Sequence, residues 1–248
     1  MKDWFWKKKT PEAPAEPTTI EGHRSQYLPY TITDAFKLKM GKSIGVEELS
    51  SLVNEQLFPE ATYLILKALK ERGMFDAHRA LLQSYLSATD RTEYQKVLRV
   101  KLSELPKDTR VEADKLTQLV MYGFDAMQEN FKTFFTEMHR AYSERDRIIV
   151  LAHAPLVGIR HLAQVCVDGD RFVILTGKDS VTGYTVSKVG TEMKVEVLPA
   201  GFVFPQSVIV ADDFTRTGAS FQKIRETLTA YQPGITIETR AMIDTSKA

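Results

Sequence analysis

The chain has 248 residues, of which 33 are basic and 32 acidic, and its formal net charge is +1. This length suits one large domain or two smaller ones, and either arrangement buries a substantial core. The balanced charge gives no indication of nucleic-acid binding, and the single cysteine, Cys166, excludes an intramolecular disulfide and a zinc cluster made of cysteines. The sequence shows neither an apolar run that could span a bilayer nor the apolar core of a signal peptide, so we expect a soluble, cytoplasmic protein.

The first 26 residues have the composition of a flexible tail followed by a Pro-rich linker. Residues 1–9 contain both tryptophans and four lysines, which suits either a tail whose aromatic rings dock on the domain or a partner, or a segment on an anionic membrane surface. We favour the tail because the segment is very short. Prolines at positions 11, 14 and 17 then predict an extended, disordered linker.

Residues 27–146 have the apolar periodicity of helices and are predicted to form an α-helical domain. Asp90 is a suitable N-cap, Gly73 a suitable C-cap and Pro106 a helix break. The expected helices cover residues 43–58, 60–72, 75–86, 91–105 and 109–145. The last carries a broad apolar stripe, which we interpret as core, and the short connections predict antiparallel packing in a small bundle.

The histidines show no metal-ligand spacing. His23, His78 and His139 stand in the tail or on separate predicted helices, so no metal site is expected from them. Cys166 lies between two valines, which predicts a buried thiol that packs as a small hydrophobe. We therefore assign no metal ligand from the sequence.

From Arg147 the pattern changes to that of an α/β domain covering residues 147–248. The expected order is strand, helix, strand, hairpin, strand, helix and strand, which implies a mainly parallel sheet. Strands are expected over 148–152, 171–176, 207–211 and 235–243, helices over 159–167 and 221–231, and a hairpin over 181–189 and 192–198 around Gly190.

The stretch from Ser207 to Ser220 carries the clearest chemical pattern. Its β-branched run at 208–210 suits a central strand, and Asp212 and Asp213 form an acidic turn where that strand ends. The loop that follows lies at the start of the next helix, where free N–H groups and the helix dipole favour an anion; its residues are Thr215, Arg216, Thr217, Gly218, Ala219 and Ser220. Carboxylates beside an anion cradle suit a sugar phosphate. The alternative interpretation is an Asp-Asp turn that only caps the helix.

This stretch resembles the ribose-phosphate binding signature of the type I phosphoribosyltransferases, a hydrophobic strand followed by two acidic residues and a Thr-Gly-x-Thr/Ser loop. The matching residues are Asp212, Asp213, Thr217, Gly218 and Ser220. The resemblance covers about the last hundred residues and implies a phosphoribosyltransferase-like sheet. It also implies that the acidic pair holds the ribose hydroxyls of phosphoribosyl pyrophosphate, that the loop binds the 5′-phosphate, and that Mg²⁺ accompanies this ligand.

The same resemblance assigns two further segments. The loop after the first core strand, residues 152–158, corresponds to the pyrophosphate loop, with His153 and Arg160 as its candidate ligand-binding residues. The family's loop is usually rich in glycine with a basic residue, whereas here Arg160 comes only in the following helix. The hairpin corresponds to a flexible loop that closes over the reacting centre. One of its lysines would then approach the pyrophosphate, and the sequence does not choose among Lys178, Lys188 and Lys194.

Three functions agree with these patterns. The first is Mg²⁺-dependent transfer of a phosphoribosyl group to a nitrogenous base or related acceptor, which would place the protein in nucleotide metabolism. The second is a non-catalytic protein that binds phosphoribosyl pyrophosphate or a nucleotide and uses its helical half for partner binding or oligomerisation. The third is a helical scaffold whose α/β half is only structural. The sequence identifies no acceptor and does not decide between a monomer and a homodimer.

Overall fold

A computed structural model describes residues 43–54, 58–112, 128–143, 147–152, 156–215 and 217–244. The chain divides into two compact units, one made of Met1–Ile44 with Glu112–Met127, and the other of Gly45–Val111 with Gln128–Ala248. The predicted tail and linker of residues 1–26 lie outside the described residues, as does most of the first unit.

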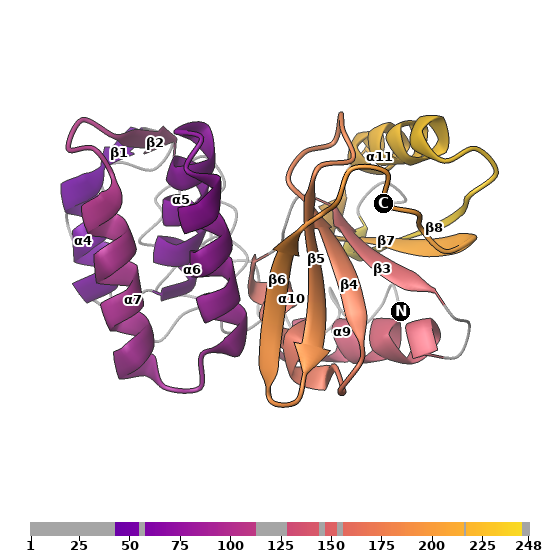
Figure 1. Cartoon of the computed structure of the whole chain (residues 1–248), viewed down its shortest axis with the longest axis horizontal. Helices are drawn as coiled ribbons and strands as arrows, with labels where there is room; N and C mark the ends of the chain where they lie inside the picture. Colours follow the sequence, from indigo (N-terminus) through magenta and orange to yellow (C-terminus); the bar gives the residue numbers. More distant parts are fainter. Residues whose placement is uncertain are drawn as a thin grey trace, which may run out of the picture. The chain divides into compact units, whose positions relative to one another are not determined.

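Four helices of the second unit pack into the small bundle that the sequence predicts (Figure 1). They are α4 (Val46–Asn54), α5 (Phe58–Glu71), α6 (Phe75–Ser87) and α7 (Arg91–Glu104). The Asp90 side chain accepts hydrogen bonds from the N–H groups of Thr92 and Glu93 and so caps α7, as predicted. Gly73 has φ 69° after α5, and Met74 N–H donates to Leu69 O at 2.8 Å, which confirms the predicted glycine C-cap.

In the helical half, the starts of two helices predicted from periodicity are wrong. The helix expected from Ser43 begins only at Val46, because β1 (Ser43–Gly45) precedes it and the Glu48 carboxylate accepts the Gly45 N–H at 2.8 Å, as in a capping box. The helix expected from Thr109 is preceded by β2 (Arg110–Glu112), which pairs with β1. Residues 113–127 lie outside the described residues, and the next described helix is α9 (Gln128–Ser143).

The α/β half contains a mainly parallel six-stranded sheet, in the order β6-β5-β4-β3-β7-β8 (Figure 1). Its strands are β3 (Ile148–Ala152), β4 (Arg171–Leu175), β5 (Gly183–Val189), β6 (Glu192–Val197), β7 (Ser207–Thr215) and β8 (Thr236–Asp244). The ladders β4-β3, β3-β7 and β7-β8 are parallel, whereas β5 and β6 form an antiparallel hairpin joined to β4. The predicted order of strands and helices along the chain and the hairpin turn at Gly190 are confirmed.

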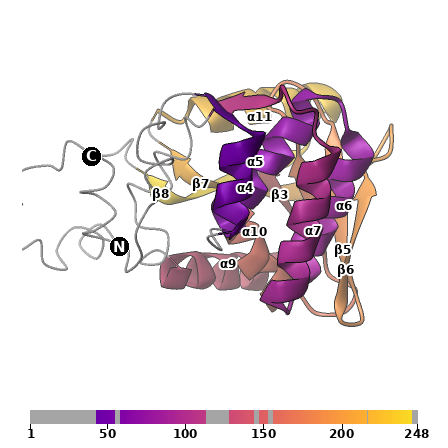
Figure 2. The ribbon, with the colours of Figure 1, turned by 90° about the vertical axis from the view of Figure 1, so that its left-hand side faces the viewer.

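Helices cover both faces of this sheet (Figures 1 and 2). On one face, Ile224 and Leu228 of α11 (Ala219–Tyr231) pack on alternate strand residues that include Val150 and Val210. On the other face lie α9 and α10 (Leu156–Val165), which contact each other. Burial on both faces explains why the central strands are continuously apolar. None of the described helices combines the length and apolarity that crossing a lipid bilayer requires.

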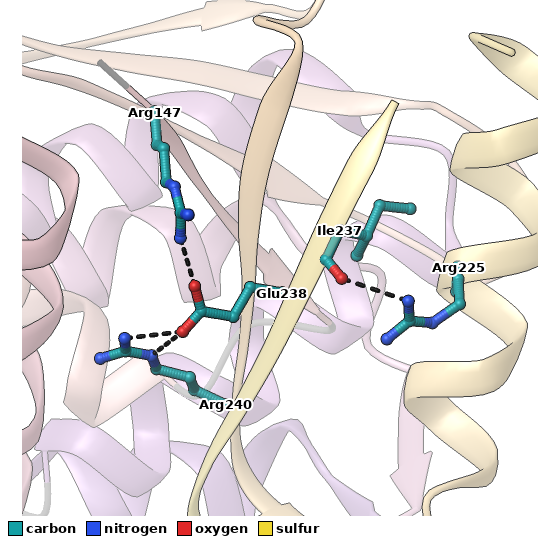
Figure 3. Close-up of polar contacts among 5 residues, drawn as sticks. All are labelled: Arg147, Arg225, Ile237, Glu238 and Arg240. Carbon is teal, nitrogen blue, oxygen red and sulfur yellow. Dashed lines mark hydrogen bonds and ion pairs between the residues drawn. The ribbon is translucent and has the colours of Figure 1, made fainter. Parts of the chain in front are cut away.

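Each edge strand of the sheet is held by side chains. At β6, Ser87 Oγ of α6 accepts the Met193 N–H at 3.2 Å, and Gln83 Oε1 accepts the Val195 N–H at 3.4 Å. At β8, the Glu238 carboxylate accepts hydrogen bonds from Arg147 and Arg240 (Figure 3). The Met193 and Val195 N–H groups of this edge strand are therefore bonded to side chains and are not available to pair with another strand.

Candidate functional site

The carboxyl ends of β3 and β7 form the topological switch point of the sheet. These two strands are parallel neighbours, but the chain leaves β3 through α10 toward β4 on one side and leaves β7 through α11 toward β8 on the other. Connections that diverge in this way leave a crevice at the strand ends, where open α/β sheets bind ligands. Both helices also begin there, so their N-terminal N–H groups lie at this end of the sheet.

Asp212 lies at this switch point, inside a strand rather than in a turn. The acidic turn predicted at Asp212 and Asp213 is wrong, because β7 continues to Thr215 and pairs with β8 as far as Asp244. The ladder between β3 and β7 ends earlier, at Leu151 and Ala211, so Asp212 extends past the end of the central strand.

Strand alternation places the Asp212 side chain on the face that α11 covers, since Val208 and Val210 face α11. This carboxylate is 6% exposed. Asp213 and Thr215 belong to the strand through their backbone, whereas Arg216 lies outside the described residues. A buried carboxylate at a ligand-binding end of a sheet is a functional-site candidate, because aspartate side chains are mostly exposed elsewhere in proteins.

The predicted loop forms the start of α11. Gly218 adopts a left-handed conformation with φ 72° at the N-cap, which explains the glycine at this position. Thr217 Oγ1 accepts the Ala219 N–H at 3.4 Å, and the Gly218 carbonyl accepts the Gln222 N–H at 2.9 Å. The helix therefore begins two residues earlier than predicted, and its first turn starts at the switch point.

Lys178 is the lysine that lies beside this helix start. Its ammonium donates to Ser220 Oγ at 2.7 Å, and its carbonyl accepts a hydrogen bond from Thr227 Oγ1 at 2.7 Å. In the same loop, Asp179 forms a 3.2 Å ion pair with Lys223 of α11. The connection between β4 and β5 is thus tied to α11, and it adds a positive charge to the N-terminus of that helix.

The other two lysines lie elsewhere. Lys194 pairs with Ser187, which in turn pairs with Arg171 at the start of β4, so this part of the hairpin lies at the opposite end of the parallel strands. Lys194 forms a 2.8 Å ion pair with Glu196, and Lys188 donates to Thr191 O at 3.1 Å. The hairpin is part of the sheet, with Met193 and Val195 buried, and it does not project over the switch point as a loop.

The predicted pyrophosphate loop is described only in part. His153 and the next two residues lie outside the described residues. Arg160 of α10 donates from Nη2 to Ala88 O at 2.7 Å, and its guanidinium lies 5.8 Å from the centre of the Tyr85 ring. Its described contacts are therefore with α6 and the segment that follows it.

One cation at this end comes from the helical half, which sequence reasoning missed. The Lys70 ammonium of α5 donates a hydrogen bond to Thr176 O, at the start of the loop that carries Lys178. The two residues are 106 positions apart in the chain, and no local pattern connects them. Only the packing of α5 near the sheet reveals the contact.

A second cluster lies at the opposite end of the sheet. His139 of α9, Cys166 after α10 and Asp170 before β4 hold their ligand atoms within 4.8 Å of one another. His139 Nε2 and Asp170 Oδ2 are 2.6 Å apart. Burial raises the pKa of the Cys166 thiol to about 12, and the Asp170 carboxylate adds to this rise. The sequence predicts the buried thiol, but the spacing of these residues gives no sign of the cluster.

No protein-family model, curated protein or solved structure matches the chain. The carboxyl end brings together the buried Asp212, the start of α11 and Lys178. It therefore combines a carboxylate that accepts hydrogen bonds with a helix N-terminus that favours anions.

Proposed function

We propose that this protein binds a phosphorylated ribose compound, phosphoribosyl pyrophosphate or a nucleotide, at the carboxyl ends of β3 and β7. The main support for this proposal is that Asp212, the α11 N-terminus and Lys178 all lie at the topological switch point. The resemblance of the Ser207–Ser220 stretch to the phosphoribosyltransferase signature points to the same ligand class.

The phosphate would bind at the start of α11. The helix dipole and the N–H groups of the first turn favour an anion there, and the Lys178 ammonium would exchange its bond to Ser220 for one to the phosphate. Gly218 leaves open space where another residue would have a Cβ, so the backbone can approach the ligand. The residues proposed to contact the phosphate are Thr215, Arg216, Thr217, Gly218, Ala219 and Ser220.

The sugar would bind at the acidic pair. Carboxylates accept hydrogen bonds from neighbouring hydroxyls, and Asp212 is held in a strand that keeps its position fixed. Mg²⁺ fits this chemistry, because it takes oxygen ligands and is usually bound by one or two carboxylates together with substrate phosphates. Asp212 and Asp213 would supply the protein part of such a site, and the ion would neutralise charge on the pyrophosphate.

The reaction that this pocket would serve is phosphoribosyl transfer to a nitrogenous acceptor, with pyrophosphate as the leaving group. The bond from the ribose C1′ to the pyrophosphate oxygen breaks while the acceptor nitrogen forms a new bond to C1′. Asp212 and Asp213 would orient the ribose, and residues 215–220 would fix the 5′-phosphate. Positioning and electrostatic stabilisation of the oxocarbenium-like transition state would supply most of the rate.

A non-catalytic binding protein is the second candidate, and two observations favour it. The guanidinium of Arg160, a candidate pyrophosphate ligand, is engaged by Ala88 O and the Tyr85 ring. The hairpin that would have to close over the reacting centre is hydrogen-bonded along its length into the sheet. Binding without chemistry requires neither a mobile cover nor an additional cation.

Calorimetric titration with phosphoribosyl pyrophosphate and Mg²⁺, and separately with nucleoside monophosphates, tests the binding proposal. We expect saturable binding of at least one of these ligands, and no heat of binding up to millimolar ligand would overturn it. Pyrophosphate release across a panel of purine and pyrimidine bases then distinguishes the two candidates. Release with one base supports the transferase, whereas binding without release from any base supports the regulatory protein.

A further inference from the structure

We infer that His139, Cys166 and Asp170 form a binding site for a borderline divalent transition-metal ion, with Zn²⁺ as the best-matched occupant. The three side chains supply one nitrogen, one sulfur and one oxygen, all of them ligand types that zinc takes in proteins. This site is separate from the proposed sugar-phosphate pocket, because it lies at the start of β4 rather than at the carboxyl ends of the parallel strands.

The separations between the ligand atoms suit a tetrahedral ion. With ligands about 2.1 Å from zinc, tetrahedral ligand atoms lie about 3.4 Å from one another. Here His139 Nε2 and Asp170 Oδ2 are 2.6 Å apart, and no pair among the three ligand atoms exceeds 4.8 Å. Admitting an ion therefore requires the His139 and Asp170 atoms to separate by under about 1 Å and a wider pair to approach by up to about 1.4 Å, which side-chain rotations provide.

The charges of the cluster also suit a divalent cation. A thiolate and a carboxylate carry two negative charges, and a neutral imidazole adds none, so the loaded site is neutral overall. Neutrality matters because the site is largely enclosed: His139 and Asp170 side chains are 19% and 13% exposed, and Cys166 is 8% exposed.

The surrounding backbone holds the ligands in place before any ion binds. The Asp170 carboxylate accepts the Val167 N–H at 2.7 Å, and the Asp170 carbonyl accepts the Lys188 N–H at 2.8 Å. In the same turn, Asp168 Oδ1 accepts the Gly190 N–H at 2.8 Å. The Val167 N–H bonds the same Oδ2 that faces His139, so it fixes this oxygen in position, and contacts that hold a ligand in place strengthen metal binding.

Among the residues that the structure describes, three side chains supply ligands, and a tetrahedral ion takes one ligand more. A closed structural site would use four ligands, so this arrangement resembles zinc sites that keep a water molecule or an exogenous ligand. The partial exposure of His139 and Asp170 gives that position access to solvent. We therefore assign the cluster to reversible metal binding with one exchangeable ligand.

Cobalt substitution tests this inference, since Cys166 is the single cysteine of the chain. Full-length protein is treated with a chelator, desalted and titrated with Co²⁺. We expect one equivalent to produce near-ultraviolet thiolate-to-cobalt charge transfer together with intense visible bands of tetrahedral cobalt, and one equivalent of Zn²⁺ to remove both. Absence of the charge-transfer band in the wild-type protein would overturn the proposal without any variant.

Variants assign the ligands. Cys166→Ser should abolish the charge-transfer band, and His139→Gln or Asp170→Asn should weaken Zn²⁺ binding by about tenfold or more, measured against a competing chelator. Asp168→Asn is the matched control, because it lies in the same turn, retains the Oδ1 acceptor for Gly190 and offers no ligand. Zinc affinity that is unchanged in Cys166→Ser, or weakened equally in Asp168→Asn, would refute the assignment, and circular dichroism of each variant separates ligand loss from unfolding.

Discussion

The two ends of one sheet differ in how their chemistry is encoded. At the carboxyl end, Asp212 and the start of α11 come from one continuous stretch of sequence, Ser207–Ser220. At the amino end, His139, Cys166 and Asp170 come from the end of α9, the end of α10 and a turn, and only the fold brings them together. The first kind of site can be found by a motif, whereas the second depends on topology.

The strand β5 connects the two ends. It starts at Gly183, opposite Leu175 at the carboxyl end of β4, and it ends at Val189, near the turn that carries Asp170. At its first end, the preceding loop places Lys178 against Ser220. At its second end, Lys188 exchanges backbone hydrogen bonds with Gly169 and Asp170. Changes in β5 should therefore affect both sites, and changes in either site should leave the other intact.

The largest expected effect is that of Gly183→Ala. A Cβ at this position would lie 1.9 Å from the Ile174 carbonyl oxygen, and backbone has to move to accommodate it. We expect a loss of about 3 kcal/mol or more in the free energy of unfolding, measured by urea denaturation. Gly190→Ala in the same hairpin is the control: it has φ 58° and open space around the new Cβ, so it should cost only roughly 1 kcal/mol. Equal losses in the two variants would contradict the close contact.

His78 should make the anchoring of β5 sensitive to acid. Its ring is buried, stacks on Tyr184 of β5 at 5.4 Å, and shares a 2.9 Å hydrogen bond between Nδ1 and the Tyr184 hydroxyl. Burial, with a smaller contribution from the Lys70 charge, lowers the pKa of His78 from 6.5 to about 4.

The direction of the pH effect follows from proton uptake. As pH falls below 6.5 the unfolded chain protonates His78 while the folded protein does not, so stability falls until pH reaches about 4. The interval between the two pKa values corresponds to a loss of roughly 3 kcal/mol. We expect this part of the acid destabilisation to disappear in His78→Gln, as judged by denaturation at several pH values. A stability difference between the two proteins that stays constant from pH 7 to pH 4 would contradict the prediction.

Features encoded by neighbouring residues could be predicted from the sequence. The bounds of β3, the Asp90 cap of α7 and the hairpin turn at Gly190 all depend on local composition, and the structure has them as predicted. Features decided by a distant partner could not be predicted. Ser43–Gly45 forms a strand because β2 pairs with it, although the adjacent periodicity favours a helix.

The same distinction applies to the candidate sites. The sequence places Asp212 correctly at the carboxyl end of a strand, but it predicts a turn because the extension of β7 depends on β8, which is more than twenty residues further along the chain. The sequence does not show which of Lys178, Lys188 and Lys194 approaches the phosphate, because this depends on the end of the sheet at which each lysine lies. The cluster of His139, Cys166 and Asp170 forms only where three elements meet, and no sequence spacing predicts this contact.

Sugar-phosphate binding and metal binding should be lost independently, because the two proposed sites lie at opposite ends of the sheet. Asp212→Asn combined with Asp213→Asn removes the charged acceptors for the ribose hydroxyls, so affinity for the sugar-phosphate ligand should fall about a hundredfold or more. Calorimetric titration measures this loss, and cobalt titration of the same variant should show an unchanged charge-transfer band. Cys166→Ser should give the reverse result. Ligand binding that survives the double change would show that the acidic pair is not the site.

The smallest expected effect is that of Lys178→Gln, which removes one positive charge from the start of α11 and keeps a hydrogen-bond donor. Affinity for a nucleoside monophosphate should fall about tenfold, because one charge-assisted hydrogen bond to phosphate is lost. The corresponding nucleoside should bind both proteins equally, since it has no phosphate for the lysine to contact. Lys194→Gln, at the opposite end of the hairpin, is the matched control and should leave both affinities unchanged. If Lys178→Gln weakened nucleoside and nucleotide binding to the same extent, its role would be to hold the loop against Ser220 rather than to bind phosphate, and the assignment of the anion to this end of α11 would lose its main support.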